Sequence, residues 1–556
     1  MSVINTHEKR LSFAKKSARA WQNYFDARNL LPGINLSPEQ IAVVMQEEDQ
    51  MLINGSAGSG KSLTLLYKLL KVMEQENEPR RILYCSFNTT LIEDAKKRRD
   101  QSERYQELKG KHTLHMNTFH NIAADILKEI GFQNAEYMRV SLANLKSKEE
   151  QITRRTMALV RSFMSSPAHE ALPTEQKLYK THADSFLKDE ILWMKANGII
   201  TEEAYLECER SGRGSNPRLT KEQRKTIFAL YQEYQAFLKR DFHNHLDLED
   251  YALLLLAHIE DIPESLKYDY IFVDEVQDLQ AMQLKALVKL AKKSLIVSGD
   301  PKQRIYKRSP FSYRALGLFI EGRKTRNLNV NYRSTKQIMK LASSIQFMDE
   351  ENDRRDDVQY VREGEKPIIA YCGTTVKQNK YIIGQIELLR KTEPNASIAV
   401  IHRHDSDSDA VRRCPVYSEL QRHFHVITAN DYGRHFDLNS VRKPIFYTDA
   451  YSIKGLEFDY VFVIHFDRQH YPNEKRLQEL ERLAGGRTGS NYEADEEQIR
   501  NDEKKLLYVS ITRAKKRVWL TYTGEDFKKI SPFVRDMYLS DFEAHGFNAK
   551  IYGKKE

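Results

Sequence analysis

Short apolar runs, rich in β-branched and aromatic residues, recur along the chain, and each ends at a glycine or a polar turn. Runs of this length and composition are typical of buried strands, which we expect at Met51–Ile53, Ile82–Tyr84, Tyr270–Val273, Leu295–Val297, Ile398–Ile401, Ile445–Tyr447 and Tyr460–Ile464. Segments with apolar residues at helical spacing separate many of them. This alternation predicts an α/β fold whose parallel sheets are covered by helices on both faces.

The predicted strands fall into two groups, before about residue 320 and after about residue 395, which indicates two α/β cores. The segment 125–245 differs, because it is charged and its apolar residues follow the helical period, as in Thr220–Lys239. We therefore expect a helical insertion in the first core. The charged stretch 470–500, which contains Gly485 and Gly486, predicts an exposed, mobile loop.

A chain of 556 residues is too long for one core and predicts about three or four domains. It has no apolar run of about 18 residues and a polar N-terminus, so neither a membrane span nor a signal sequence is expected. Single, scattered cysteines are typical of a protein of the reducing cytoplasm. The net charge of +9 permits a polyanionic partner without identifying one.

One eight-residue run fits the phosphate-binding pattern G-x-x-x-x-G-K-[ST]: Gly55-Ser56-Ala57-Gly58-Ser59-Gly60-Lys61-Ser62. It lies between a predicted strand and a predicted helix, which is the context that this loop requires. The glycines allow backbone N–H groups to approach phosphate oxygens, and the helix N-terminus adds positive partial charge. Lys61 is expected to reach the β- and γ-phosphates of ATP, and Ser62 to bind Mg²⁺. A chance match in a flexible loop is the weaker alternative.

An acidic pair ends the predicted strand at Tyr270–Val273, where ligands of parallel sheets bind. Asp274 is expected to hold Mg²⁺ at the phosphates, and Glu275 to orient and deprotonate the attacking water. A solvated acidic turn is the alternative, and the phosphate-binding loop makes it the weaker one.

Further blocks follow in a fixed order: LSPEQ at 36–40, SFN at 86–88, TFH at 118–120, DEVQD at 274–278, SGDPKQRIY at 298–306, NYRST at 331–335, KGLEFD at 454–459 and LYVSITRAK at 507–515. With them, residues from about 36 to 520 resemble the superfamily 1 helicases of the UvrD/Rep/PcrA type. The resemblance implies two RecA-like parallel-sheet motor domains, with the helical insertion in the first. The expected limits are 1–124 and 246–325 for the first motor domain with an N-terminal extension at 1–35, 125–245 for the insertion, 326–545 for the second motor domain and 546–556 for a C-terminal tail.

The resemblance also assigns roles in the nucleotide site. Gln40 would read adenine, Tyr332 would stack on the base, and Glu457 would accept a hydrogen bond from a ribose hydroxyl. At the γ-phosphate, a sensing amide and two arginine fingers are implied: Gln303, Arg333 and Arg513. For the two arginines, a surface salt bridge is the alternative that only the motif context disfavours.

Contacts with a single nucleic-acid strand are implied for Phe87, Asn88, Thr118, Phe119, His120, Tyr306 and Tyr451. Phe87 and Phe119 are equally compatible with a place in the core beneath the sheet. The basic runs at 96–99 and 210–224 would neutralise phosphates or simply be exposed helix faces, and the second interpretation is favoured.

Three features depart from the family pattern. Leu63 stands where relatives usually carry an arginine, and Tyr451 where they often carry a histidine. The third is length: residues 404–444 are too few for the second accessory domain of the family, since a domain takes about 50 residues or more. A compact protein is expected, regulated by a protein partner or by residues 1–35.

The leading functional prediction is therefore an ATP-dependent 3′→5′ motor on single-stranded or tailed duplex DNA, with no membrane association. A nucleic-acid-gated ATPase switch that controls a partner effector, such as a nuclease, is the alternative. A P-loop kinase is a third and weaker one, because it leaves the two arginine blocks unexplained.

Overall fold

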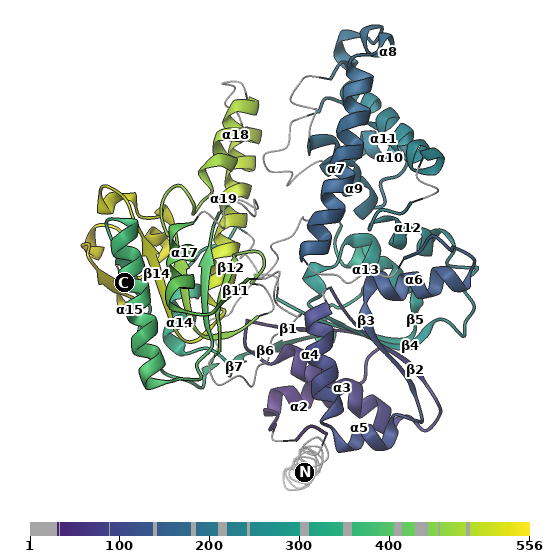
Figure 1. The fold of residues 1–556 in the computed structure, drawn as a ribbon. Coiled ribbons are helices and arrows are strands. Elements are labelled where there is room, and N and C mark those ends of the chain that lie inside the picture. The colour runs from purple at the N-terminus through teal and green to yellow at the C-terminus, as the bar shows by residue number, and fades with distance from the viewer. Residues whose placement is uncertain are drawn as a thin grey trace, which may run out of the picture.

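Two all-parallel sheets form the centres of two lobes, and a helical insertion rises from the first lobe (Figure 1). The computed structural model describes residues 30–32, 34–87, 89–136, 142–178, 185–208, 219–241, 245–300, 311–348, 359–404, 414–428, 443–453, 456–484 and 490–555. The α/β fold predicted from the alternating pattern is confirmed. None of the described helices combines the length and apolar character that crossing a bilayer requires.

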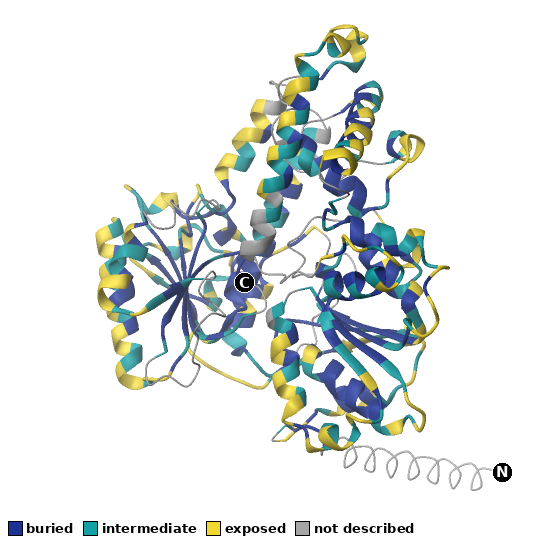
Figure 2. Ribbon diagram, turned by 45° about the vertical axis from the view of Figure 1, so that its right-hand side comes forward, coloured by how far each residue is buried: buried dark blue, intermediate teal, exposed yellow. Residues whose placement is uncertain are grey.

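The first sheet has the strand order β3-β2-β4-β5-β1-β6. Its strands are β1 (Gln50–Gly55), β2 (Arg81–Ser86), β3 (Thr113–Thr118), β4 (Tyr268–Asp274), β5 (Ala291–Gly299) and β6 (Thr325–Leu328). The helices of this lobe are α2 (Pro38–Met45), α3 (Lys61–Gln75), α4 (Thr89–Asp100), α5 (Glu103–Leu108), α6 (Phe119–Glu129), α12 (Asp250–Ala257) and α13 (Ala281–Leu290). Figure 2 shows the strands as a buried layer between helices, as expected for a parallel sheet.

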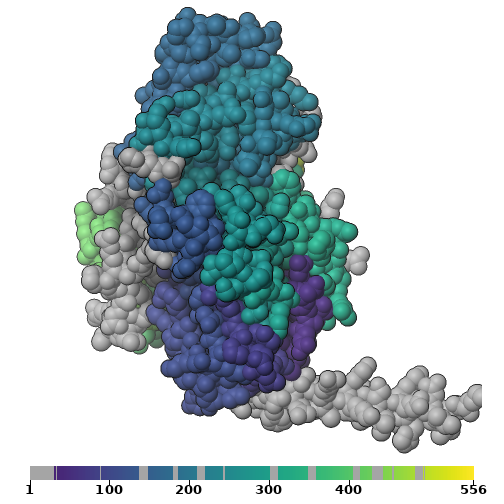
Figure 3. Space-filling view, turned by 90° about the vertical axis from the view of Figure 1, so that its right-hand side faces the viewer, coloured from purple at the N-terminus to yellow at the C-terminus, as the bar shows by residue number. Residues whose placement is uncertain are grey.

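The insertion consists of α7 (Leu142–Met164), α8 (Pro167–Glu170), α9 (Ser185–Ala196), α10 (Glu202–Glu207) and α11 (Lys221–Asp241). It has its own apolar core, which includes Trp193, Ile227 and Tyr234. In the space-filling view of Figure 3, the insertion stands above the first lobe. The fully buried Lys195 of α9 donates to Asp247 (2.7 Å) and Asp250 (2.9 Å), and these contacts fix the insertion to the chain that returns to the first lobe.

The second sheet has the order β11-β12-β10-β13-β14-β9-β15. Its strands are β9 (Ile368–Tyr371), β10 (Ile398–His402), β11 (Val426–Thr428), β12 (Ile445–Asp449), β13 (Phe458–Ile464), β14 (Ala514–Tyr522) and β15 (Glu543–His545), while β7 (Val330–Asn331) and β8 (Gln359–Tyr360) form a separate pair. The helices are α14 (Lys336–Ser343), α15 (Thr375–Thr392), α17 (Pro415–His423), α18 (Glu474–Ala484) and α19 (Ser490–Ile511).

The prediction of a mobile loop at 470–500 is wrong, because α18 and α19 occupy most of it. Leu480 and Ile499 are buried, and ion pairs spaced four residues apart, such as Arg500 to Glu496 at 2.7 Å, support the helix. The few apolar residues that these helices bury are outnumbered by charged residues in the sequence, which therefore resembles a loop. The two glycines fall at 485–486, outside the described residues.

The lobes also differ from the expected limits. Strand β6 pairs with β1, so the first lobe extends to Leu328, beyond the predicted boundary at 325. At the C-terminus, Phe547 and Tyr552 pack against the core of the second lobe, so residues 546–555 are part of that lobe rather than a free tail.

Candidate nucleotide-binding site

The phosphate-binding loop joins the carboxyl end of β1 to the start of α3 at Lys61. Gly58 and Gly60 have φ angles of +88° and +84°, a region that side-chain-bearing residues rarely adopt. A Cβ atom on Gly58 would also lie 2.6 Å from the Cβ of Arg333. Gly58 is therefore required both by its backbone angle and by its close contact with Arg333 of the second lobe.

The Lys61 ammonium is buried within this loop. Its Nζ donates to the carbonyl oxygens of Gly55 (3.0 Å) and Ser56 (3.1 Å). Burial lowers the pKa of Lys61, while Glu275 and other nearby acidic groups oppose the shift. The hydroxyls of Ser56 and Ser59 are buried without a hydrogen-bond partner among the described residues. Two buried hydroxyls without partners, beside a buried ammonium, suit a phosphate group.

The acidic pair follows β4. The Asp274 carboxylate accepts hydrogen bonds from Ser298 Oγ (2.6 Å) and Tyr84 OH (3.1 Å), and the Ser62 hydroxyl also hydrogen-bonds to it. Burial and the neighbouring Glu275 raise the pKa of Asp274. The oxygen atoms of Ser62 and Asp274, beside the second carboxylate of Glu275, match the ligands that Mg²⁺ prefers.

Glu275 lies in the left-handed region (φ +54°), which turns its side chain out of the strand direction. The Gln277 Nε2 donates to the Glu275 carboxylate, and Gln277 Oε1 accepts from the backbone N–H of Asp300 at 3.2 Å. Gln277 therefore holds Glu275 against the end of β5. The motif D-E-x-Q-D contained this residue, but the sequence alone did not indicate the contact.

Two arginines reach the site from the second lobe. Arg333 forms an ion pair with Glu457, which also lies 3.5 Å from the Lys515 ammonium. Arg513 is only 2 % exposed and donates to Val509 O (3.0 Å). Burial and the nearby Arg333 lower the pKa of Arg513 to about 10, although Glu457 and Glu275 act in the opposite sense.

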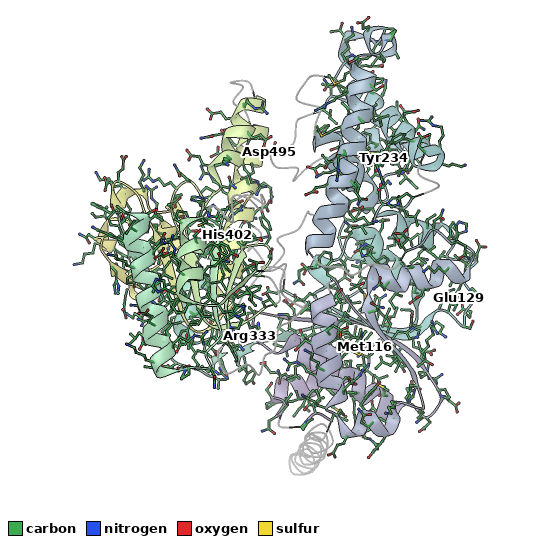
Figure 4. The ribbon with its side chains drawn as sticks, viewed as in Figure 1. Met116, Glu129, Tyr234, Arg333, His402 and Asp495 are labelled. Carbon is green, nitrogen blue, oxygen red and sulfur yellow. The ribbon has the colours of Figure 1, made fainter. Side chains whose placement is uncertain are left out.

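These groups surround one cavity of about 340 Å³. The residues that line it come from both lobes and include Gly58, Gly60, Lys61, Ser62, Asp274, Glu275, Tyr332, Arg333, Glu457, Arg513 and Lys515. Figure 4 labels Arg333 where the second lobe meets the first. Leu63, one of the expected departures from the family pattern, also lines the cavity.

Asn331 connects the two lobes and was not singled out by the sequence, although it begins the N-Y-R-S block. It is fully buried, and its Nδ2 donates to Ala57 O at 2.6 Å. Its Oδ1 accepts from the backbone N–H groups of Arg333 (2.9 Å) and Ser334 (3.1 Å). The Tyr332 N–H donates to Gly58 O at 3.1 Å. The phosphate-binding loop and the Arg333 segment are thus joined directly.

The structure places one predicted nucleotide contact, Gln40, against the loop and does not describe another, Gln303. The Gln40 amide is buried against the loop, where Nε2 donates to Ser59 O (3.1 Å) and Oε1 accepts from Ser37 N (2.9 Å). It therefore supports the loop in this structure, and its contact with adenine stays a prediction. Gln303 lies outside the described residues.

Among the described residues, the predicted nucleic-acid contacts do not form one exposed surface. Thr118, Phe119 and His120 are buried, and burial lowers the pKa of His120 to about 4. For Phe119 the structure shows the core position that the sequence left open. Phe87 is half-buried, and the half-buried Tyr451 ring lies 5.1 Å from the Arg403 guanidinium. Asn88 and Tyr306 lie outside the described residues.

Comparison with known proteins agrees with this architecture. The family model for the UvrD/REP helicase N-terminal domain matches residues 36–308, and that for the UvrD-like helicase C-terminal domain matches 326–415 and 448–525. The chain belongs to the UvrD-like superfamily 1 helicases, which confirms the predicted resemblance.

Among curated relatives, the probable DNA helicase II homolog of Mycoplasma capricolum is 24 % identical over 391 residues, which cover 66 % of this chain and 49 % of the relative. The putative ATP-dependent DNA helicase YjcD of Bacillus subtilis is 23 % identical and covers 69 % of this chain and 48 % of its own length. The ATP-dependent DNA helicase PcrA of Staphylococcus epidermidis is 26 % identical over 328 residues, which cover 56 % of this chain and 40 % of the relative. The chain spans about half the length of the curated relatives it matches.

Proposed function

We propose that this protein is an ATP-dependent motor that moves 3′→5′ along single-stranded DNA and unwinds tailed duplexes. The observation that supports the proposal most strongly is the cavity shared by the two lobes, because it unites Lys61 and Glu275 with Arg333 and Arg513. The relatives bear the names of DNA helicases, which supports DNA as the polymer. The four cysteines, all within the described residues, form no disulfide with one another, which suits the cytoplasm, where we place the protein.

Within this proposal, each side chain has a role at the triphosphate. Lys61 leaves the loop carbonyls and binds the β- and γ-phosphates, while Ser62 and Asp274 hold Mg²⁺, which would neutralise phosphate charge. Glu275 accepts the proton of the attacking water. Arg333 and Arg513, with Gln303, stabilise charge on the γ-phosphoryl group, and an arginine finger is typically worth ~10³–10⁵ in rate.

The adenosine end is assigned to Gln40, Tyr332 and Glu457. Glu457 is paired with Arg333 in this structure, so ribose binding by Glu457 requires that the pair opens as the nucleotide enters. A cycle in which one carboxylate alternates between Arg333 and the nucleotide would couple ATP occupancy to the position of the finger. A strand held by both lobes, with Phe87, Asn88, Tyr306 and Tyr451 as proposed contacts, would then be moved by each closure and opening.

The test is the ATPase rate of the full chain with matched single-stranded DNA, duplex DNA and RNA, together with displacement of 3′- and 5′-tailed duplexes. Strong stimulation by single-stranded DNA and displacement of 3′-tailed duplexes are expected. Glu275→Gln should reduce turnover by about 10²–10⁴ while ATP binding is kept, because the attacking water loses its proton acceptor. Glu264→Gln, on the surface, is the matched control. A normal rate of ATP hydrolysis in Glu275→Gln would show that Glu275 is not the general base.

A nucleic-acid-gated ATPase switch that controls a partner effector is the second candidate. The observation that favours it is the short connection from β10 to β12, where the described residues form only α17 and β11. Strand displacement distinguishes the two candidates, since a switch shows DNA-stimulated ATPase without displacement. A pull-down that recovers only the isolated chain, with full unwinding activity, would argue against partner control.

A further inference from the structure

Three histidines gather at the carboxyl edge of the second sheet. His404 follows β10, His465 follows β13 directly, and His470 lies in the turn that leads to α18. Strands β10 and β13 are parallel neighbours, so their ends meet at one edge. The candidate ligand atoms of the three rings all lie within 4.8 Å of one another. Figure 4 labels the neighbouring His402 in this part of the lobe.

Two ring nitrogens of this histidine cluster have unmet hydrogen-bonding capacity. His404 Nε2 and His465 Nδ1 are buried and lack a hydrogen-bond partner within the part of the chain that the structure describes. Buried polar nitrogens are nearly always satisfied in folded proteins, and two on neighbouring rings, whose centroids lie 4.4 Å apart, point to a missing common partner. His465 also holds a φ of +67°, a costly backbone angle that aims this ring at the other two.

The third ring is oriented by a carboxylate. His470 Nδ1 lies 2.7 Å from Asp467 Oδ1. When Nδ1 donates to this oxygen, Nε2 carries the lone pair that a metal ion needs. A carboxylate behind a histidine in this way is the usual support of a metal-binding imidazole, because it fixes the tautomer and the ring orientation.

We propose that His404, His465 and His470 bind a divalent transition-metal ion, with Zn²⁺ as the preferred occupant. Imidazole nitrogens suit Zn²⁺, whereas Mg²⁺ and Ca²⁺ prefer oxygen ligands. Zn–N bonds of ~2.0–2.1 Å in a tetrahedron place nitrogens about 3.4 Å apart. The most separated pair therefore has to approach by at most about 1.4 Å, which would require the rings to rotate when the ion binds.

This site is separate from the nucleotide cavity. Glu457 precedes β13 and lines the cavity, whereas His465 follows the same strand at its other end. The metal would join the ends of β10 and β13 to the turn that begins α18. Its expected role is to fix the base of the α18–α19 projection, and the proposal holds whether or not the protein is a motor.

The full chain, stripped with a chelator and free of nucleotide, is titrated with Co²⁺ and then with Zn²⁺. One Co²⁺ per chain with strong visible absorption of a tetrahedral site is expected, and Zn²⁺ should displace it. His465→Asn should weaken Zn²⁺ binding by about 100-fold or more, and asparagine keeps the backbone preference of this position. Asp467→Asn should weaken it by about 10–100-fold.

His423→Asn, an exposed histidine on α17, is the matched control and should bind like the unmodified chain. His404→Gln gives a second test if His465→Asn fails to fold. Less than about 0.1 bound Zn²⁺ per folded chain would overturn the proposal. Unchanged affinity in either folded histidine variant, or an octahedral Co²⁺ spectrum, would overturn it as well.

Discussion

Replacing Asn331 by alanine tests how the two lobes cooperate in ATP hydrolysis. The Asn331 side chain is fully buried and bonds to the phosphate-binding loop on one side and to the Arg333 segment on the other. It touches no reacting group, so it is a positioning residue. We expect Asn331→Ala to lower the DNA-stimulated ATPase rate because Arg333 is no longer held in register with the loop.

The magnitude follows from the contacts. The three hydrogen bonds, to Ala57 O, Arg333 N and Ser334 N, contribute about 1 kcal/mol each, or about 3 kcal/mol together. At 1.36 kcal/mol for each factor of ten, the loss corresponds to a rate decrease of about 10²-fold. This is less than the ~10³–10⁵ expected for removal of the finger in Arg333→Ala.

The assay is steady-state ATPase at saturating single-stranded DNA, with ATP affinity measured separately. If Asn331 acts through Arg333, the double variant Asn331→Ala/Arg333→Ala should be no slower than Arg333→Ala alone. The control is Asn327→Ala on β6, whose exposed side chain accepts from Asn54 and should leave the rate within about twofold. Fully additive losses in the double variant, or a normal rate in Asn331→Ala, would refute the reasoning.

Three further changes have defined outcomes. Gln277→Ala frees the Glu275 carboxylate and should lower kcat by about tenfold at unchanged ATP affinity, and single-turnover kinetics that match the unmodified chain would contradict this. Burial raises the pKa of Glu249 to about 7 from 4.5, so the folded state holds its proton to higher pH, and the free energy of unfolding decreases as the pH rises through this window. Glu249→Gln keeps the hydrogen-bond acceptor for Gln280. Relative to the unmodified chain, its free energy of unfolding should be higher by up to about 3 kcal/mol at pH 8 and by little at pH 5. An equal change in melting temperature at both pH values would exclude the titration of Glu249 as the origin. Lys195→Met leaves Asp247 and Asp250 buried without a cation and should lower the free energy of unfolding by roughly 3–5 kcal/mol. Thermal unfolding measures this, with Lys239→Met at an exposed position as the control. Equal shifts in melting temperature for the two variants would contradict the prediction.

Local patterns predicted the apolar strands β1, β2, β4, β5, β10, β12 and β13 and the phosphate-binding loop, but they did not predict strands such as β3 and β14. The phosphate-binding loop lies between β1 and α3 because strand, turn and helix signals stand next to each other in the sequence. Helices α18 and α19 were missed because charged residues outnumber the few buried ones, such as Leu480 and Ile499. A narrow apolar stripe beside a glycine pair has the composition of a loop, and only its packing shows otherwise.

Contacts between distant segments could not be predicted in this way. Asn331 meets Ala57 only because β6 returns the chain to the first sheet before the second lobe begins. The motif placed Gln277 near the acidic pair, but its bond to the Asp300 N–H depends on the register of β4 and β5. His404 and His465 come together because β10 and β13 are parallel neighbours, and no local pattern shows this pairing.

Helix α19 connects the projecting part of the second lobe to the nucleotide site. Figure 1 shows α18 and α19 projecting from the lobe, and Arg513 follows the end of α19. Midway, the fully buried Glu503 accepts from Arg403 (2.6 Å) at the end of β10 and from Arg476 (2.9 Å) on α18. These ion pairs tie α18 and α19 to the end of β10, and breaking the buried Arg403–Glu503 pair would be costly. Helix α19 therefore forms a continuous connection from α18 to Arg513, which lines the cavity.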